Sequence, residues 1–326
     1  MLNSLNIEQF KTHNSGSYDA IPLSYETFGC TLGTAPIVLV NHALTGNSSV
    51  VGENGWWKDL IGDGKCIDTL QYSILAFNIP GNGYDGFLID NYEDFSVFDV
   101  ASLFLKGLEL LKIDSLFAVI GGSLGGSVTW QMTVLQPKLT EHIIPIASDW
   151  RATDWVLAQC RIQKQLLENS SQPVEDARMH AMTFYRTPQS LTAKFNRFKQ
   201  VGSKKYDVEN WLESHGEKLQ KRFHLKAYKL MNHLLMTADV TDGTRNFIDS
   251  AKRIKGAIHL IGIDSDQFYL NEEIKKSYLA LSELKSNVSF SEINSIHGHD
   301  GFLIELDQLT EILRDIFQLQ IIPISE

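Results

Sequence analysis

Short, continuous apolar runs rich in valine and isoleucine recur along the chain and are bounded by turn residues. Runs of this length are typical of β-strands buried on both faces, because both rows of alternating side chains must then be apolar. Residues 17–29 precede them, and we expect this segment to form an antiparallel hairpin or strand pair. The buried strands are predicted within residues 35–43, 72–81, 116–122, 141–148, 256–263 and 287–293.

Helical periodicity separates these apolar runs. Ahead of the run at 116–122, apolar side chains recur at intervals of three and four residues, which places them on one face of an α-helix. Strands that alternate with helices predict an α/β protein with a mostly parallel central sheet. The residues of this apolar face are Val97, Val100, Phe104, Leu108 and Leu111.

A long segment without convincing strand-like runs interrupts this alternation. Residues 149–248 contain polar-flanked helical stretches, and the strand pattern returns at 256. A helical insertion in an α/β sheet is most simply a cap over the carboxyl edge of the strands, where ligands bind in open α/β folds. The predicted core is therefore formed by residues 1–148 and 249–326, and the cap by residues 149–248.

Composition narrows the class of protein. The 326-residue chain has a formal net charge of -10 at pH 7 and no long basic run, which argues against a nucleic-acid partner. Three widely spaced cysteines without a CxxC motif suit a reducing compartment better than a disulfide framework. The N-terminus is polar and no apolar stretch approaches 18 residues, so we expect a cytoplasmic protein that neither is secreted nor enters the membrane.

The string GGSLGG surrounds Ser123 with glycines where an apolar run meets a helical pattern. Glycines this dense weaken both strands and helices, so a local constraint must require them. A tight strand-to-helix turn would explain them without any function for Ser123. A functional explanation is the G-x-S-x-G nucleophile elbow, in which the serine is exposed on a sharp turn.

An elbow serine needs an acid and a histidine, and chains of the α/β-hydrolase fold supply them in that order after the serine. Asp264 and Asp266 follow one late strand, and His297 and His299 follow the next. Each aspartate alone is more often a turn residue or helix cap. The string HGHD could also suggest a metal site, but no convincing ligand set accompanies it, so we expect no metal. The joint order favours a triad with Ser123.

An oxyanion hole needs two backbone N–H groups. The N–H of Leu124, the residue after the serine, is one candidate, and the N–H of Leu44 in the loop 40–49 is the other. His42 in the same loop could serve as a second base. We favour a structural role in shaping this loop for His42, because His299 already fills the catalytic position.

Six strings along the chain belong together: NHALTG, GWWKDLIGDGKCIDT, GGSLGG, DARMHAMTFYR, WLESHGEKLQKRF and GHDGFLIE. Together they resemble the homoserine O-acetyltransferase family, whose members are acyltransferases of the α/β-hydrolase fold. The resemblance extends from about residue 23 to 306, with its pieces in the family's order. The elbow is common to many hydrolases, whereas the strings around residues 42–46, 55–69 and 298–305 are more specific.

The resemblance implies a ping-pong acyl transfer. Ser123 would take the acetyl group of acetyl-CoA, and His299 would deprotonate the hydroxyl group of homoserine that accepts it. Asp266 fits the family's triad acid better than Asp264. Acetyl-CoA would be a co-substrate, and no metal, redox or prosthetic cofactor is implied.

The family also binds its amino-acid substrate through three side chains, which correspond here to Arg178, Tyr185 and Asp300. An arginine fork suits the substrate carboxylate, and a carboxylate suits its ammonium group. By themselves, Arg178 would be read as a surface helix residue and Asp300 as a helix cap. The expected partners are small-molecule substrates and, through the cap helices, a second copy of the chain.

The chain departs from the family in places that leave substrate identity open. The segment between QKQLLEN and VEDARMH, near residues 168–175, is shorter than expected, the loop 78–87 differs, and His224 stands where an aspartate is usual. Serine could replace homoserine, or succinyl-CoA could replace acetyl-CoA. The same sequence pattern is also compatible with an esterase or thioesterase that uses water, and with a non-catalytic binding module.

Overall fold

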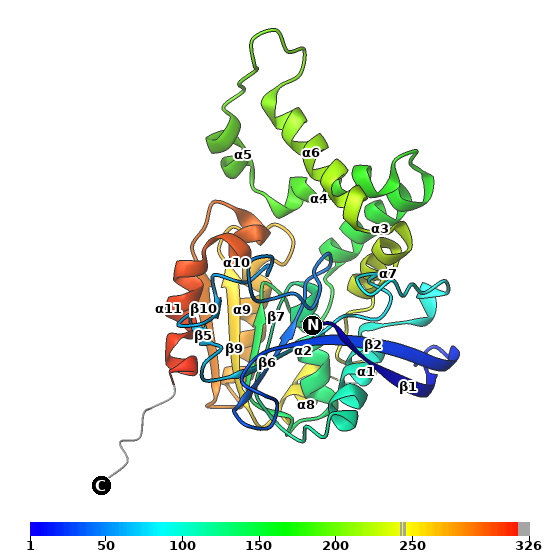
Figure 1. The fold of residues 1–326 in the computed structure, drawn as a ribbon. Helices are drawn as coiled ribbons and strands as arrows, with labels where there is room; N and C mark the ends of the chain where they lie inside the picture. The colour runs from blue at the N-terminus through cyan, green and yellow to red at the C-terminus, as the bar shows by residue number, and fades with distance from the viewer. Residues whose placement is uncertain (242, 244–245, 319–326) are drawn as a thin grey trace.

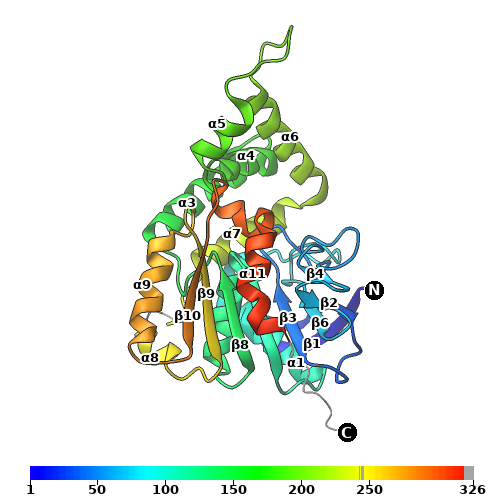
Figure 2. The ribbon, with the colours of Figure 1, turned by 90° about the vertical axis from the view of Figure 1, so that its left-hand side faces the viewer.

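The computed structural model describes residues 1–241, 243 and 246–318. Its centre is an eight-stranded sheet in the order β1-β2-β6-β3-β7-β8-β9-β10 (Figures 1 and 2). β1 and β2 pair antiparallel with each other, β2 pairs antiparallel with β6, and the remaining neighbours are parallel. The strands are β1 (Asn3–Lys11), β2 (Ser17–Gly29), β3 (Ile37–Asn41), β6 (Ser73–Phe77), β7 (Leu116–Gly122), β8 (Thr140–Ile146), β9 (Ala257–Ile263) and β10 (Val288–Ile293).

The predicted mostly parallel α/β sheet is confirmed, with one correction at its antiparallel end. Residues 17–29 form a single strand rather than a hairpin, and the polar segment before them supplies its partner β1. A further pair, β4 (Ile61–Gly62) and β5 (Ile67–Asp68), lies outside the main sheet.

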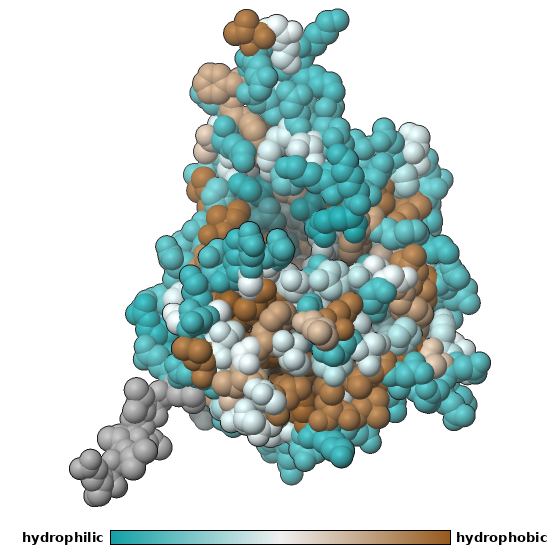
Figure 3. All heavy atoms as spheres, viewed as in Figure 1, coloured by the Kyte–Doolittle hydropathy of each residue, from teal (hydrophilic) through white to brown (hydrophobic). Residues whose placement is uncertain are grey.

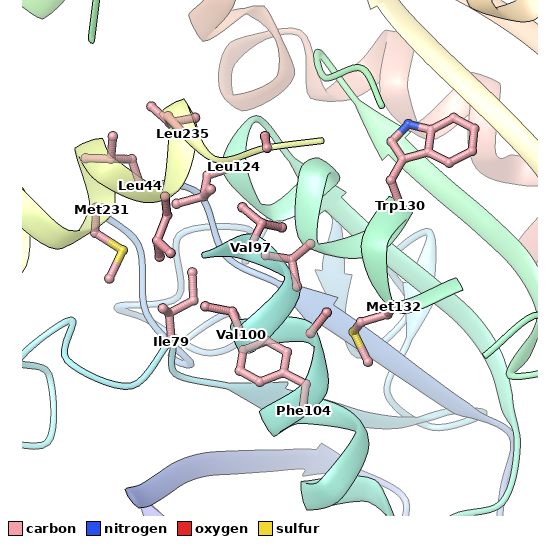
Figure 4. Packing of buried hydrophobic residues seen from close by; sticks show 14 of the residues in the cluster. Leu44, Ile79, Val97, Val100, Phe104, Leu124, Trp130, Met132, Met231 and Leu235 are labelled. Atoms are coloured by element: carbon pink, nitrogen blue, oxygen red, sulfur yellow. The ribbon is translucent and has the colours of Figure 1, made fainter. Parts of the chain in front are cut away.

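Helices cover both faces of the sheet. Alternate side chains of a strand point to opposite faces, and because both rows are apolar here, each face must be covered. Leu39 of β3 belongs to the apolar cluster that includes α1 and α2, which Figure 4 shows, whereas Val38 and Val40 belong to the cluster that includes α11. The core helices are α1 (Val97–Leu110), α2 (Leu124–Leu135), α8 (Phe247–Ala251), α9 (Asn271–Ser282), α10 (Gly301–Ile304) and α11 (Leu306–Phe317), with 3-10 turns η1 (Tyr92–Asp94) and η2 (Gly298–Asp300).

α1 begins where the sequence pattern begins. Its N-terminus carries a capping box, in which the side chains of Ser96 and Asp99 each accept a hydrogen bond from the other residue's backbone N–H. The predicted apolar face is buried from Val97 to Leu108, and Leu111 is partly buried after the helix end.

The cap consists of helices that project beyond one end of the sheet (Figures 1 and 2). The chain leaves the core after β8, and a bridge between Arg151 and Asp239 joins the outgoing and returning segments. The predicted limits 149 and 248 remain a prediction, although the cap helices lie inside them. These helices are α3 (Asp154–Asn169), α4 (Pro173–Tyr185), α5 (Pro188–Phe195), α6 (Asp207–Arg222) and α7 (Leu225–Met236).

The surface is hollowed where the cap meets the core (Figure 3). Within the described part of the chain, no helix has the length and apolar character needed to span a bilayer.

Candidate active site

Ser123 lies at the sharp junction between β7 and α2. Its φ of 55° and ψ of -125° fall in a region that non-glycine residues rarely adopt. Its backbone N–H donates to the carbonyl of Ile146 on the neighbouring strand at 2.9 Å, which fixes the turn. Strain of this kind is characteristic of a nucleophile elbow.

The surrounding glycines allow the strand, the helix and the neighbouring loop to approach closely. A Cβ atom at Gly125 would lie 2.2 Å from the carbonyl oxygen of Asn41, and one at Gly121 would lie 2.4 Å from that of Gly125. At Gly122 it would lie 2.5 Å from the ring of Phe302. Side chains of any size are excluded here, which explains the unusual glycine density.

The structure brings Ser123, His299 and Asp266 into one hydrogen-bonded chain. Nε2 of His299 lies 2.8 Å from Oγ of Ser123, and Nδ1 lies 2.7 Å from Oδ2 of Asp266. All three residues are buried. The other carboxylate oxygen of Asp266 accepts hydrogen bonds from the backbone N–H groups of Phe268 and Tyr269 at 2.7 and 3.0 Å. These bonds hold the carboxylate toward the imidazole.

The remaining aspartate and histidine of the two motifs have separate partners. The carboxylate of Asp264 accepts the backbone N–H of Ser295 at 2.9 Å and supports the loop that precedes His299. Nδ1 of His297 lies 2.7 Å from Nη2 of Arg186. The two histidines of HGHD are thus engaged separately.

Aromatic rings enclose the imidazole of His299. The ring of Tyr185 lies 5.3 Å from it, that of Phe268 5.3 Å, that of Tyr269 6.0 Å and that of Phe302 5.7 Å, between centroids. This enclosure lowers the local dielectric and strengthens the interactions within the triad. Of these residues only Tyr185 was expected at the site, as a substrate-binding residue implied by the resemblance, and none of the four was expected to enclose the imidazole.

The expected oxyanion residues lie beside the elbow. Leu124 is the first residue of α2, so its N–H belongs to the positive end of the helix dipole. Leu44 follows β3, and both side chains are buried in the same cluster (Figure 4). Across the described residues, neither backbone N–H has an acceptor within the chain.

His42 shapes the loop that carries Leu44. Its Nδ1 lies 2.8 Å from the carbonyl of Ala43, and its Nε2 accepts the backbone N–H of Ile79 at 3.0 Å. Burial lowers the pKa of His42 to about 4, so the ring is neutral near pH 7. This geometry agrees with the structural role expected for His42.

The residues expected to bind the amino acid also gather around His299. Tyr185 ends α4 and is buried, and the guanidinium of Arg178 lies 5.7 Å from its ring centroid. Burial raises the pKa of Tyr185 well above its usual value, so the phenol remains protonated. Asp300 directly follows His299, and burial raises the pKa of its carboxyl against the opposing charges of Arg178, His299 and Arg186.

Arg186 is a residue of the site that sequence reasoning missed. Its Nη1 lies 3.9 Å from Oδ2 of Asp300. The only sequence signal for it is its position directly after Tyr185 in the string DARMHAMTFYR.

Each departure from the family pattern has a defined place in the structure. Nδ1 of His224 accepts the backbone N–H of Lys226 at 3.1 Å, so the imidazole caps α7 as an aspartate would. In the divergent loop, the side-chain NH2 of Asn78 donates to the hydroxyl of Ser48 at 3.0 Å and links this loop to the segment after β3. The shortened segment near 168–175 is a brief connection between α3 and α4.

The α/β-hydrolase fold family matches residues 36–217, more than half of the chain. The chain therefore belongs to the α/β-hydrolase class, in agreement with its sheet order and its strained serine. A solved structure of esterase E22 shares the fold with a TM-score of 0.86 at 16% identity, over 98% of this chain and 100% of that one.

Relatives place the chain more narrowly. A homoserine O-acetyltransferase of Methanosphaera stadtmanae is 30% identical over 89% of this chain and 68% of its own length. A homoserine O-acetyltransferase of Salinibacter ruber is 28% identical over 96% of each. The chain belongs to the homoserine O-acetyltransferase family, which confirms the resemblance.

Proposed function

We propose that this enzyme transfers the acetyl group of acetyl-CoA to the hydroxyl of L-homoserine, a step of methionine biosynthesis. The observation that carries the proposal is the hydrogen-bonded chain of Ser123, His299 and Asp266 beside Arg178 and Asp300. A nucleophile with its base supports acyl transfer, and two opposite charges beside it support an amino-acid acceptor.

In the first half-reaction, Oγ of Ser123 attacks the thioester carbonyl while Nε2 of His299 takes its proton. The N–H groups of Leu44 and Leu124 stabilise the tetrahedral oxyanion. The C–S bond then breaks, His299 returns the proton to the CoA sulfur, and the acetyl group remains on Ser123. Asp266 orients the imidazole and stabilises its protonated form.

In the second half-reaction, His299 removes the proton of the acceptor hydroxyl, which attacks the acetyl-serine carbonyl. The bond to Oγ breaks and the proton returns to Ser123. The guanidinium of Arg178 would bind the carboxylate of homoserine, and Asp300 its ammonium group. The protonated phenol of Tyr185 would complete the acceptor site.

The assignment of acetyl-CoA as the donor is supported by the relatives, which are homoserine O-acetyltransferases. A small, largely enclosed cavity lies next to Tyr185 and Phe268, whose rings flank His299, but no residue of the triad lines it. The choice between an acetyl and a succinyl group is therefore made by the experiment below.

The proposed chemistry needs no metal or prosthetic group, because a thioester and an alcohol exchange an acyl group by proton transfers alone. We further propose a cytoplasmic location, supported by three unpaired thiols. A homodimer through the cap is supported by exposed Phe198 and Val201 in the connection between α5 and α6, at the tip of the cap (Figure 1).

The test is the release of CoA thiol from acetyl-CoA with L-homoserine, with L-serine and without an acceptor, with products identified by mass. We expect homoserine-dependent release and O-acetylhomoserine. A preference for serine, or for succinyl-CoA in place of acetyl-CoA, would change the substrate assignment. Equal release without an acceptor would favour an esterase or thioesterase. This is the second candidate function, because the chain shares its fold with esterase E22.

A further inference from the structure

The two arginines beside the site are held differently. Across the described residues, the guanidinium of Arg178 has no hydrogen-bond acceptor, and it lies over the ring of Tyr185. In contrast, Nε and Nη2 of Arg186 donate to Oγ of Ser190 at 3.1 and 2.6 Å, and Nη2 also donates to Nδ1 of His297 at 2.7 Å. Arg178 is therefore available to a substrate carboxylate, whereas Arg186 is already engaged.

Asp300 is paired with Arg186 by charge without a hydrogen bond. The two side chains are 19% and 11% exposed, and 3.9 Å separates Oδ2 of Asp300 from Nη1 of Arg186. No donor in the described part of the chain hydrogen-bonds to this carboxylate. Its lone pairs are thus free to accept the N–H groups of a ligand.

Arg186 is the cation that persists beside Asp300 during the reaction. A bound substrate carboxylate would pair with Arg178, and the proton carried by His299 changes during the two half-reactions, whereas a guanidinium stays protonated throughout. Burial raises the pKa of Asp300, and the charge of Arg186 opposes this effect. Without Arg186, a smaller fraction of Asp300 would be ionised, and a bound ammonium group would have a weaker charged partner.

The same arginine fixes the cap to the loop that carries His299. Its partner Ser190 is buried in the first turn of α5, and its partner His297 precedes η2. The hydroxyl of Thr187 also donates to the carbonyl of Ile296. The orientation of Asp300 relative to Arg178 therefore depends on this connection.

We propose that Arg186 is a positioning residue for the acceptor step, which keeps the carboxylate of Asp300 charged and oriented toward the ammonium group of an α-amino-acid acceptor. The inference rests on the proposed function, in which Asp300 binds that group. Arg186 acts through Asp300 and does not itself contact the acceptor.

The test compares L-homoserine with 4-hydroxybutyrate, which has the same hydroxyl and carboxylate but no amino group. In Arg186→Gln, we expect kcat/KM for homoserine to fall about tenfold or more, as for the loss of a charged interaction. For 4-hydroxybutyrate it should change less than about threefold, because Asp300 has no ammonium group to bind there. The wild-type preference for homoserine should thus collapse.

Further variants separate charge from structure. Arg186→Lys retains the cation and should recover part of the preference, and Ser190→Ala, which loosens Arg186, should reduce it by a smaller factor. Arg253→Gln removes an exposed arginine and should leave both acceptors unchanged. Release of p-nitrophenol from p-nitrophenyl acetate in a first-turnover burst reports that each variant still folds and acylates Ser123.

Two outcomes would overturn different conclusions. If Arg186→Gln keeps the preference, or lowers kcat/KM equally for both acceptors, Arg186 has no specific role in binding the amino group. If the wild type does not prefer homoserine, or Asp300→Asn keeps the preference, the proposed acceptor site is wrong, and this inference fails with it.

Discussion

At the scale of single residues, the site depends on conformations and partners that few side chains can supply. Ser123 keeps a strained backbone because Ile146 holds its N–H and the glycines leave room around it. Asp266 faces His299 because two backbone N–H groups hold its other oxygen. Single substitutions should therefore separate the loss of a reacting atom from the loss of the contacts that position it.

Replacing Ser123 by alanine removes the nucleophile and keeps the Cβ atom. We expect acetyl transfer to be abolished, while the free energy of unfolding changes by less than about 1 kcal/mol. Product formation and urea denaturation measure the two effects. A variant that retained most of its activity would show that the elbow assignment is wrong.

Replacing Asp266 by asparagine should lower kcat by roughly 10⁴-fold, because the amide no longer holds the imidazole in the required tautomer. The matched control is Asp264→Asn, whose amide oxygen can still accept the N–H of Ser295. Steady-state kinetics should show nearly normal activity for the control. Equal losses in the two variants would contradict the choice of Asp266 as the triad acid.

At the scale of elements, the junction between β7 and α2 is set by close backbone approach. The N-terminus of α2 packs against the end of β3, and Gly125 is the point of contact with the carbonyl of Asn41. A rigid backbone atom cannot yield as the end of a flexible side chain can. The position of Ser123 therefore depends on how α2 packs.

Gly125→Ala should displace the start of α2 and destabilise the fold by about 2 kcal/mol or more, because the new Cβ meets backbone. Activity should fall as well, since Ser123 begins the same turn. Gly62→Ala is the control, because the nearest atom to its Cβ would be the Cγ atom of the flexible Lys65 side chain, at 3.2 Å. If the midpoint temperature of thermal unfolding falls equally in both variants, there is no specific close approach at Gly125.

At the scale of the whole molecule, buried groups join loops that are distant in the chain. His42 connects the loop after β3 to the segment after β6 through the N–H of Ile79. The cap is fixed to the core in a similar way by Arg186 and His297. The active site therefore lies where several such connections meet.

Stability should depend on the protonation of His42. Its pKa is about 4 in the folded state, below the ordinary value of 6.5, so the unfolded chain binds more protons between these values. Its contribution is complete above pH 6.5 and is lost as pH falls toward 4, by about 3 kcal/mol in total. Urea denaturation of wild type and His42→Gln across this range measures the difference in pH dependence.

The control for this measurement is His224→Asn, which alters an exposed histidine and can still cap α7. Its pH dependence should match that of the wild type. If the stability of His42→Gln falls as steeply with acid as that of the wild type, His42 does not contribute the expected acid sensitivity.

The sequence by itself determined the alternation of strands and helices, the elbow around Ser123 and the order of serine, aspartate and histidine. These features are encoded in local periodicity, in turn-forming residues and in short strings, all of which can be recognised without the three-dimensional structure. The long polar-flanked segment likewise predicted helices between β8 and β9.

The resemblance already favoured Asp266, but only the tertiary structure showed its contact with His299, paired the polar segment of β1 with β2, and placed Arg186 beside Asp300. The rings of Tyr185, Phe268 and Tyr269 reach His299 from segments that are distant from it in the chain, so no local pattern could bring them together. Such contacts depend on how elements pack, because burial and charge pairing are set by neighbours in space and not by neighbours in sequence.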